Sequence, residues 1–244
     1  TNSVATQFNW LQDDTVPTMV ITASQGADGF TSDDAALSLT FTSSQATTNF
    51  AVGDIQVSNC ALTDFATTST TVYTATCTAT ADGATTIDVA ADGYTDAAGN
   101  DNPAATQFNW VQDDTKPTMT ITASQGADGF TSNDAALSLT FTSNEATSNF
   151  VVGDIQVTNG DLTSFTANGG STTVYTATFT PTADGATTID VAASGYTDAA
   201  GNDNSAATQF NWVQDDTKPT MTITASQGAD GFTSNDAALS LTFT

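Results

Sequence analysis

The chain repeats itself with a period close to one hundred residues. Residues 104–142 recur without a change at residues 206–244, and residues 4–42 carry the same stretch with five substitutions. The equivalent residues Pro17, Pro117 and Pro219 lie 100 and then 102 positions apart. Periods of roughly 20 to 50 residues indicate solenoids, whereas about 100 residues suffice to bury an independent core. The sequence therefore predicts a tandem array of similar domains.

Composition points to strands rather than helices. Every one of the 27 acidic residues except Glu145 is aspartate, and threonine is abundant. Aspartate favours turns, threonine favours strands, and both are poor residues for a helix interior. Hydrophobic residues make up 39% of the chain, which is enough to build cores.

In the second repeat, turn residues separate seven short runs that alternate between apolar and polar positions. A period of two is typical of strands with one buried face. Seven short antiparallel strands in about 100 residues predict a two-sheet β-sandwich of immunoglobulin type. The predicted strands, lettered A to G, cover residues 118–124, 136–142, 150–158, 162–166, 174–180, 187–193 and 207–213.

The domain boundaries follow from the positions of these predicted strands. The predicted fold class is all-β, with tandem immunoglobulin-like seven-stranded sandwich domains joined end to end by short linkers. Residues 13–112 are assigned to the first repeat and residues 113–214 to the second. Residues 1–12 are expected to be the last strand of an upstream repeat. Residues 215–244 are expected to be the first two strands of a truncated downstream repeat.

Charge excludes several classes of function. The formal net charge is −25, the only basic residues are Lys116 and Lys218, and histidine is absent. A surface this negative repels phosphate backbones and anionic lipid, so neither nucleic acid nor direct membrane contact is expected. Catalysis by histidine is impossible. The remaining reactive groups are carboxylates on turns, so no enzymatic activity is expected.

Four motifs of the second repeat carry a family resemblance. They are Asp-Asp-Thr-Lys-Pro-Thr-Met-Thr-Ile-Thr from residue 113, Phe-Thr-Ser-Asn-Glu-Ala from residue 141, Thr-Val-Tyr-Thr-Ala-Thr-Phe-Thr-Pro from residue 173 and Gly-Tyr-Thr-Asp-Ala-Ala-Gly-Asn from residue 195. The chain resembles the bacterial immunoglobulin-like repeats of giant surface adhesins, the calcium-binding extender domains of biofilm-associated and RTX-type adhesins. The resemblance implies an extracellular, cell-surface, structural role with Ca²⁺ at the domain joints.

Topology gives an independent reason to examine the joints. In this sandwich the B–C and F–G loops lie at the pole where the chain enters, here termed the proximal pole, opposite the distal pole. Asp114 of the linker is therefore expected to approach Glu145, Asp198 and Asn202, and such hard oxygen ligands suit Ca²⁺. The resemblance carries over to Asp114, Glu145 and Asp198. The first repeat offers Asp14, Asp96 and Asn100 with Gln45 in place of Glu145, and Asp216 occupies the Asp114 position of the next joint.

A second acidic cluster is conceivable at the distal pole. Ordinary turn chemistry is the stronger interpretation there, because Asp-Gly pairs cap backbone N–H groups in turns. The candidate residues are Asp28, Asp33 or Asp34 and Asp82 in the first repeat, and Asp128, Asp134 and Asp184 in the second.

The two cysteines lie in the first repeat. Cys60 and Cys77 correspond to Gly160 and Phe179 in the second, so both positions change together. Both lie on strands expected to pair, which predicts a cross-strand disulfide and fits an oxidising exterior. Two buried free thiols are the alternative.

The leading functional hypothesis is a structural extender segment of a long extracellular bacterial adhesin or filament, rigidified by calcium. Its expected partners are neighbouring identical repeats in the same chain, with lateral or strand-exchange contacts between identical chains also considered. A β-sandwich that binds glycan or ice is one alternative, and it would require surface aromatic residues clustered on one pole. An acidic surface-layer protein of a halophile is another, and it would respond to salt rather than to calcium.

Overall fold

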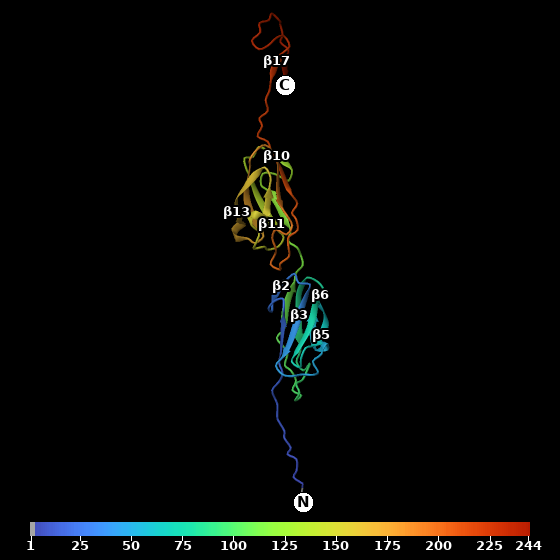
Figure 1. Cartoon of the computed structure of the whole chain (residues 1–244). Helices are drawn as coiled ribbons and strands as arrows, with labels where there is room; N and C mark the ends of the chain where they lie inside the picture. Colours follow the sequence, from blue (N-terminus) through green and yellow to red (C-terminus); the bar gives the residue numbers. More distant parts are fainter. Residues whose placement is uncertain (1–2) are drawn as a thin grey trace.

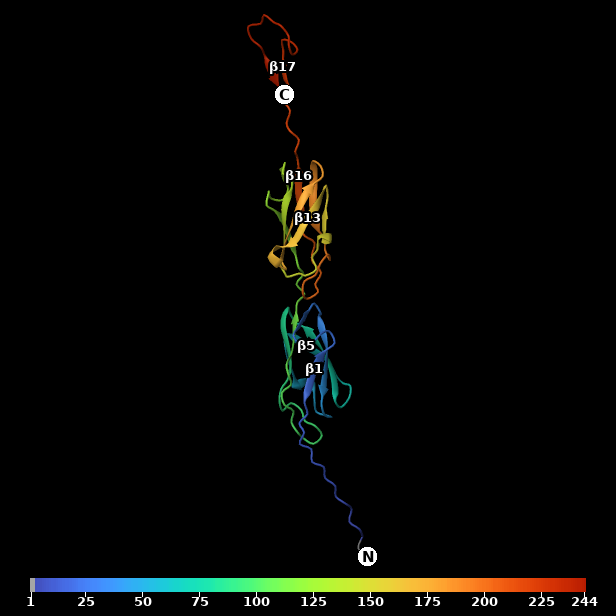
Figure 2. The same ribbon diagram turned by 90° about the vertical axis from the view of Figure 1, so that its left-hand side faces the viewer.

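The computed structural model describes residues 3–244 and contains two complete β-sandwiches stacked end to end (Figures 1 and 2). Residues 3–12 extend from the first sandwich without regular structure, and a two-stranded hairpin follows the second. Within residues 3–244, no helix is long and apolar enough to cross a membrane. The predicted all-β tandem sandwich fold is confirmed.

Each repeat consists of two four-stranded sheets. In the first repeat the strand orders are β1-β3-β6-β5 and β2-β8-β7-β4. All neighbouring strands are antiparallel except β2 and β8, which are parallel. The strands are β1 (Met19–Ala23), β2 (Phe30–Ser32), β3 (Ala36–Ser43), β4 (Ile55–Ser58), β5 (Cys60–Thr67), β6 (Val72–Ala79), β7 (Gly83–Val89) and β8 (Phe108–Gln112), with a 3₁₀ turn η1 (Val52–Asp54) before β4.

The second repeat has the same topology, with sheets β9-β11-β14-β13 and β10-β16-β15-β12. Its extra two residues form part of a 3₁₀ turn, η3 (Asn168–Gly170), between the fourth and fifth predicted strands. The elements are β9 (Met119–Ala123), β10 (Phe130–Ser132), β11 (Leu137–Ser143), η2 (Val152–Asp154), β12 (Ile155–Val157), β13 (Gly160–Ala167), β14 (Val174–Pro181), β15 (Gly185–Val191) and β16 (Phe210–Gln214).

The structure differs from the seven predicted strands in two places. β9 pairs antiparallel with β11, and after a turn the short β10 pairs parallel with β16, so the first strand divides between the two sheets. A strand of three residues is too short to show alternation, which explains why β10 was not predicted. The strand predicted over residues 150–158 is shorter, because η2 takes up its first half.

Aromatic side chains organise the core of the second repeat. Trp212 is fully buried, and its Nε1–H donates to Ser132 Oγ at 3.1 Å. At the proximal pole, Phe150 packs edge-on against Tyr175 and Tyr196, with ring centroids 5.1 Å apart in both pairs. Phe150 follows the B–C turn and Tyr196 begins the F–G loop, so both loops are anchored to one core.

The repeats fill one core position differently. In the first, the disulfide expected from the paired substitution joins Cys60 of β5 to Cys77 of β6, with Cα atoms 5.6 Å apart. In the second, Phe179 is fully buried, and a Cβ atom added at Gly160 would collide with the Phe179 ring. The ring therefore needs the glycine opposite it, which explains why both residues change together.

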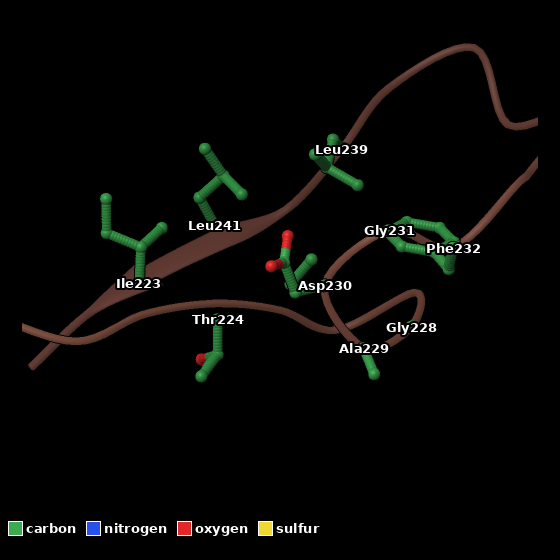
Figure 3. A pocket seen from close by; sticks show the side chains of 10 residues that line it. Ile223, Thr224, Gly228, Ala229, Asp230, Gly231, Phe232, Leu239 and Leu241 are labelled. Carbon is green, nitrogen blue, oxygen red and sulfur yellow. The ribbon is translucent and has the colours of Figure 1, made fainter.

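The C-terminal hairpin, β17 (Ile223–Ala225) and β18 (Leu241–Phe243), leaves an open hollow of about 710 Å³ (Figure 3). Ile223 and Leu241 line it. Their counterparts in the second repeat, Ile121 and Leu139, are buried in the core. The hollow therefore corresponds to the inner face of a sandwich rather than to a ligand site.

Candidate metal centre at the domain joint

The linker is hydrogen-bonded to the first repeat. The N–H of Asp114 donates to Asp82 Oδ1 at 3.1 Å, and the Thr115 hydroxyl donates to Asp82 Oδ2 at 2.9 Å. The two repeats also touch directly, because the N–H of Asp33 donates to the Ala200 carbonyl at 3.2 Å. The linker and these contacts set the proximal pole of the second repeat against the distal pole of the first.

The F–G loop of the second repeat is folded around Asp198. Its Oδ1 accepts hydrogen bonds from the N–H groups of Ala200 at 2.8 Å, Gly201 at 2.8 Å and Asn202 at 3.0 Å. Gly201 has φ +106°, a conformation that side chains disfavour. Asn202 Nδ2 donates both to Asp198 Oδ2 at 3.0 Å and to the Asp113 carbonyl at 2.8 Å. Asn202 thus ties the loop to the linker.

A second asparagine supports this loop from inside the sandwich. Asn204 is 2% exposed, and its Oδ1 accepts from the N–H groups of Gly195 and Tyr196 at 2.7 and 2.9 Å. Its Nδ2 donates to the carbonyls of Ala192 and Ser205, each at 2.8 Å. Four hydrogen bonds therefore hold both ends of the F–G loop together.

Three carboxylates from separate segments converge at the proximal pole of the second repeat. Asp113, Glu145 and Asp198 each offer one oxygen atom, and these oxygens lie within 4.8 Å of one another. All three side chains are partly buried. Burial raises the pKa of Glu145, and the neighbouring Asp198 and Asp113 raise it further. Among the described residues, this is the one group of three or more metal-ligating side chains.

The donor set fits a hard divalent cation. Asn144 Nδ2 donates to Glu145 Oε1 at 3.0 Å, but Glu145 Oε2 is buried without a hydrogen-bond partner. A buried, unpartnered carboxylate oxygen among other negative charges is unfavourable unless a cation shares the site. Carboxylate and carbonyl oxygens are the ligands that Ca²⁺ prefers. Asp113, Glu145 and Asp198 are therefore the residues that would hold it.

The structure corrects the predicted linker residue. Asp114, which we expected beside Glu145 and Asp198, is instead exposed and hydrogen-bonded through its backbone to Asp82. Asp113 takes the expected place. Neighbouring side chains of an extended segment point in opposite directions, so only one of two adjacent aspartates can face the second repeat. Asp216, the counterpart of Asp114, likewise lies beside Asp184.

The first repeat keeps the loop but not the acidic group. Asp96 accepts hydrogen bonds from three backbone N–H groups. The side chain of Asn100 also donates to Asp96 and is the main reason that the pKa of Asp96 is lowered. Gln45 Nε2 donates to the Thr15 carbonyl at 2.6 Å. Asp14 is exposed and joins no group of three acids. An amide hydrogen bond thus links the B–C turn to the linker where the second repeat has Glu145.

The distal aspartates do not assemble as a cluster of the kind considered from the sequence. Asp28 and Asp128 each accept from the backbone N–H of an asparagine on the last strand, at 2.7 Å in both repeats. Asp134 Oδ2 accepts a hydrogen bond from the hydroxyl of Ser132 at 2.7 Å. Asp33 contacts the following repeat, and Asp82 and Asp184 contact the linkers.

Sequence reasoning missed two residues of this region. Which of Asp113 and Asp114 faces the second repeat depends on how the extended linker is rotated about its axis. Two adjacent aspartates give no sequence signal for that rotation. Asn204 belongs to the run Asn-Asp-Asn after Gly201, in which Asn202 and Asn204 are both buried, and nothing in that run shows that Asn204 is the one that holds the two ends of the loop together.

A family profile described as "Bacterial Ig-like domain" matches residues 13–111 and again residues 113–214. No curated protein sequence matches the chain.

Several solved structures are similar at low identity. The FdeC adhesin of Escherichia coli is 15% identical, with 80% of this chain and 64% of that chain covered and a TM-score of 0.44. Invasin, described as a bacterial integrin-binding protein, is 18% identical over 85% of this chain and 41% of its own, with a TM-score of 0.43. InvD of Yersinia pseudotuberculosis is 17% identical over 86% and 62%, with a TM-score of 0.36. This chain therefore spans less than two thirds of each.

Proposed function

The chain belongs to the bacterial Ig-like domain family, and from this premise we propose that it is a structural extender segment of a long extracellular bacterial adhesin or filament, rigidified by Ca²⁺ at the joint. One observation carries the calcium part. The carboxylates of Asp113, Glu145 and Asp198 meet between the linker and two loops, and Glu145 Oε2 is buried there without a partner.

The residues of the joint support this role by position. Asp113 belongs to the linker, whereas Glu145 and Asp198 belong to the second repeat, so a shared cation would fix the linker to that repeat. Asn202 acts as a positioning residue, because it holds both the Asp113 carbonyl and Asp198. Without a cation, repulsion among the three carboxylates opposes their close approach.

The proposed calcium binding contributes little free energy at a single joint. Extracellular calcium modules bind at about 10⁻⁴ to 10⁻³ M, so a tenfold excess over Kd adds about 1.4 kcal/mol per site. This energy is small beside the stability of a domain, but it acts on the angle between domains. The proposed partners are the neighbouring repeats of the same chain, and the proposed location is the cell exterior.

The alternative ligand-binding hypothesis has less support. It required aromatic side chains clustered on the surface of one pole. The tyrosines and tryptophans of the two repeats, including Trp110, Trp212, Tyr94 and Tyr196, are buried.

Small-angle X-ray scattering of the whole chain tests the proposal. We expect the maximum dimension and the rigidity to fall when a chelator removes calcium, and to return with millimolar Ca²⁺ but not with Na⁺ of equal ionic strength. Glu145→Gln is the matched variant, because the first repeat carries glutamine at this position, and it should make the profile independent of calcium. An unchanged wild-type profile would contradict the proposal, and an equal response to Na⁺ would favour the acidic surface-layer alternative.

A further inference from the structure

The chain contains two Asn-Gly pairs, Asn159-Gly160 and Asn168-Gly169, and both lie in the second repeat. In such a pair the amide nitrogen of the glycine can attack the side-chain carbonyl carbon of the asparagine, because glycine has no Cβ atom to obstruct the approach. The first repeat has Asn59-Cys60 at the first position, and its turn at residues 67–70 contains neither asparagine nor glycine. This chemistry is therefore available to one repeat and not to the other.

The structure leaves Asn168 exposed and its side chain unrestrained. Asn168 begins η3, the turn between β13 and β14. Its carbonyl accepts from the N–H of Ser171 at 3.1 Å, whereas its side chain has no hydrogen-bond partner within residues 3–244. A Cβ atom added at Gly169 would meet no atom within 4 Å, so the space beside the pair is open. The Asn168 side chain can therefore rotate toward the nitrogen of Gly169.

The structure restrains Asn159 in the other pair. Asn159 is half-buried, its Nδ2 donates to the Ala183 carbonyl at 2.8 Å, and its Oδ1 accepts from the Thr182 hydroxyl at 3.3 Å. Gly160 begins β13 and pairs with Pro181 of β14, which fixes the backbone at the point of attack. Attack at Asn159 would have to break both side-chain hydrogen bonds. Two Asn-Gly pairs of one domain thus differ in their freedom to react.

We propose that Asn168 is a site of spontaneous modification in the folded protein, at which the side-chain amide becomes a carboxylate, and that Asn159 is protected from it. The Gly169 nitrogen forms a bond to Cγ of Asn168, and the side-chain nitrogen takes up the glycine proton and leaves as ammonia. Water then opens the resulting five-membered succinimide at either of its two carbonyls. One product is aspartate, and the other is isoaspartate, in which the main chain runs through the former side-chain carbonyl.

The modification changes the charge and the backbone of one turn at the proximal pole. This turn adjoins the B–C turn, because the carbonyls of Thr172 and Thr173 accept from the N–H groups of Thr147 and Ser143, each at 2.8 Å. Either product adds one negative charge to a chain whose net charge is −25, and isoaspartate also adds a methylene to the main chain. The modified fraction should therefore record the age of the folded chain. The proposal uses none of the joint carboxylates and does not depend on the proposed function.

Mass spectrometry of the whole chain, incubated in mildly alkaline buffer and then digested with chymotrypsin, tests the site. Cleavage after Phe150, Phe165 and Tyr175 places Asn159 in the peptide 151–165 and Asn168 in the peptide 166–175. The measured quantity is the rate of amide-to-acid conversion in each peptide. Two hydrogen bonds of ordinary net strength should make conversion at Asn159 at least about tenfold slower than at Asn168.

Incubation in guanidinium chloride is the matched control, because unfolding removes the restraint and should make the two rates nearly equal. Thr182→Val, which removes one hydrogen bond of Asn159, should speed conversion at Asn159 and leave Asn168 unchanged. Asn168→Ala should abolish the acidic species that ion-exchange chromatography separates from the wild type. The proposal is overturned if the two asparagines convert equally in the folded chain, if Asn168 converts only after unfolding, or if the difference in rate persists in guanidinium chloride.

Discussion

At the scale of single residues, Glu145 is expected to lower the stability of the calcium-free protein and to make its stability depend on calcium. Glu145→Gln should raise the free energy of unfolding in chelator by up to about 1 kcal/mol, because it removes a partly buried charge beside two others. It should also abolish the gain of about 1.4 kcal/mol expected for the wild type at a tenfold excess of calcium over Kd. Urea unfolding with and without calcium measures both effects. Equal calcium gains in the two proteins would remove Glu145 from the site.

Asn204 is expected to matter more for stability than any acidic residue of the joint. Asn204→Ala removes four hydrogen bonds and leaves buried N–H and carbonyl groups without partners, so it should destabilise the second repeat by about 3 kcal/mol. Asn168→Ala, on an exposed turn, is the control and should change stability by less than about 0.5 kcal/mol. Thermal unfolding followed by near-ultraviolet circular dichroism compares them. A similar Tm for both variants would refute the role given to Asn204.

At the scale of strands, the Gly160–Phe179 pair between β13 and β14 can be exchanged for the cysteine pair of the first repeat. This exchange tests whether the two pairs are interchangeable in the core. Gly160→Cys alone should cost at least about 1 to 3 kcal/mol, because its Cβ would meet the Phe179 ring. Phe179→Cys alone should cost about 3 kcal/mol through the cavity it leaves. The oxidised double variant with Gly160→Cys and Phe179→Cys should recover most of that loss, as the equivalent residues of the first repeat form a disulfide. A double-mutant cycle of unfolding free energies measures the coupling, and additive losses would show that the two pairs are not interchangeable.

Prediction from sequence worked where many residues contribute and failed where one residue decides. The sandwich follows from alternation over several strands, and the paired change at Cys60 and Cys77 indicated their contact. The short β10 was missed because three residues carry no periodic signal. Topology and the family resemblance both placed Glu145 and Asp198 at one pole. Asp114 was predicted in the place that Asp113 takes, because a shift of one residue reverses which side chain faces the next repeat.

At the scale of the whole molecule, the two repeats should lengthen differently under force. The disulfide encloses a segment between Cys60 and Cys77 with a sequence separation of 17, so this segment cannot extend while the bond is intact. At about 3.5 Å per residue, the first repeat should release about 60 Å less contour length than the second. Single-molecule pulling of the chain measures these increments. Reducing agent should make them nearly equal, and equal increments before reduction would contradict the expectation.

The two adjacent aspartates make the joint sensitive to the number of residues in the linker. Asp113 faces the repeat ahead and Asp114 lies with the repeat behind, so each side chain has its assigned neighbour only while the count of linker residues stays fixed. Inserting one residue would swap the two assignments, whereas inserting two would restore the facing but lengthen the gap. The two-residue difference between the repeats lies in the turn at residues 167–170, far along the chain from the linker, where length can vary without changing which aspartate serves which domain.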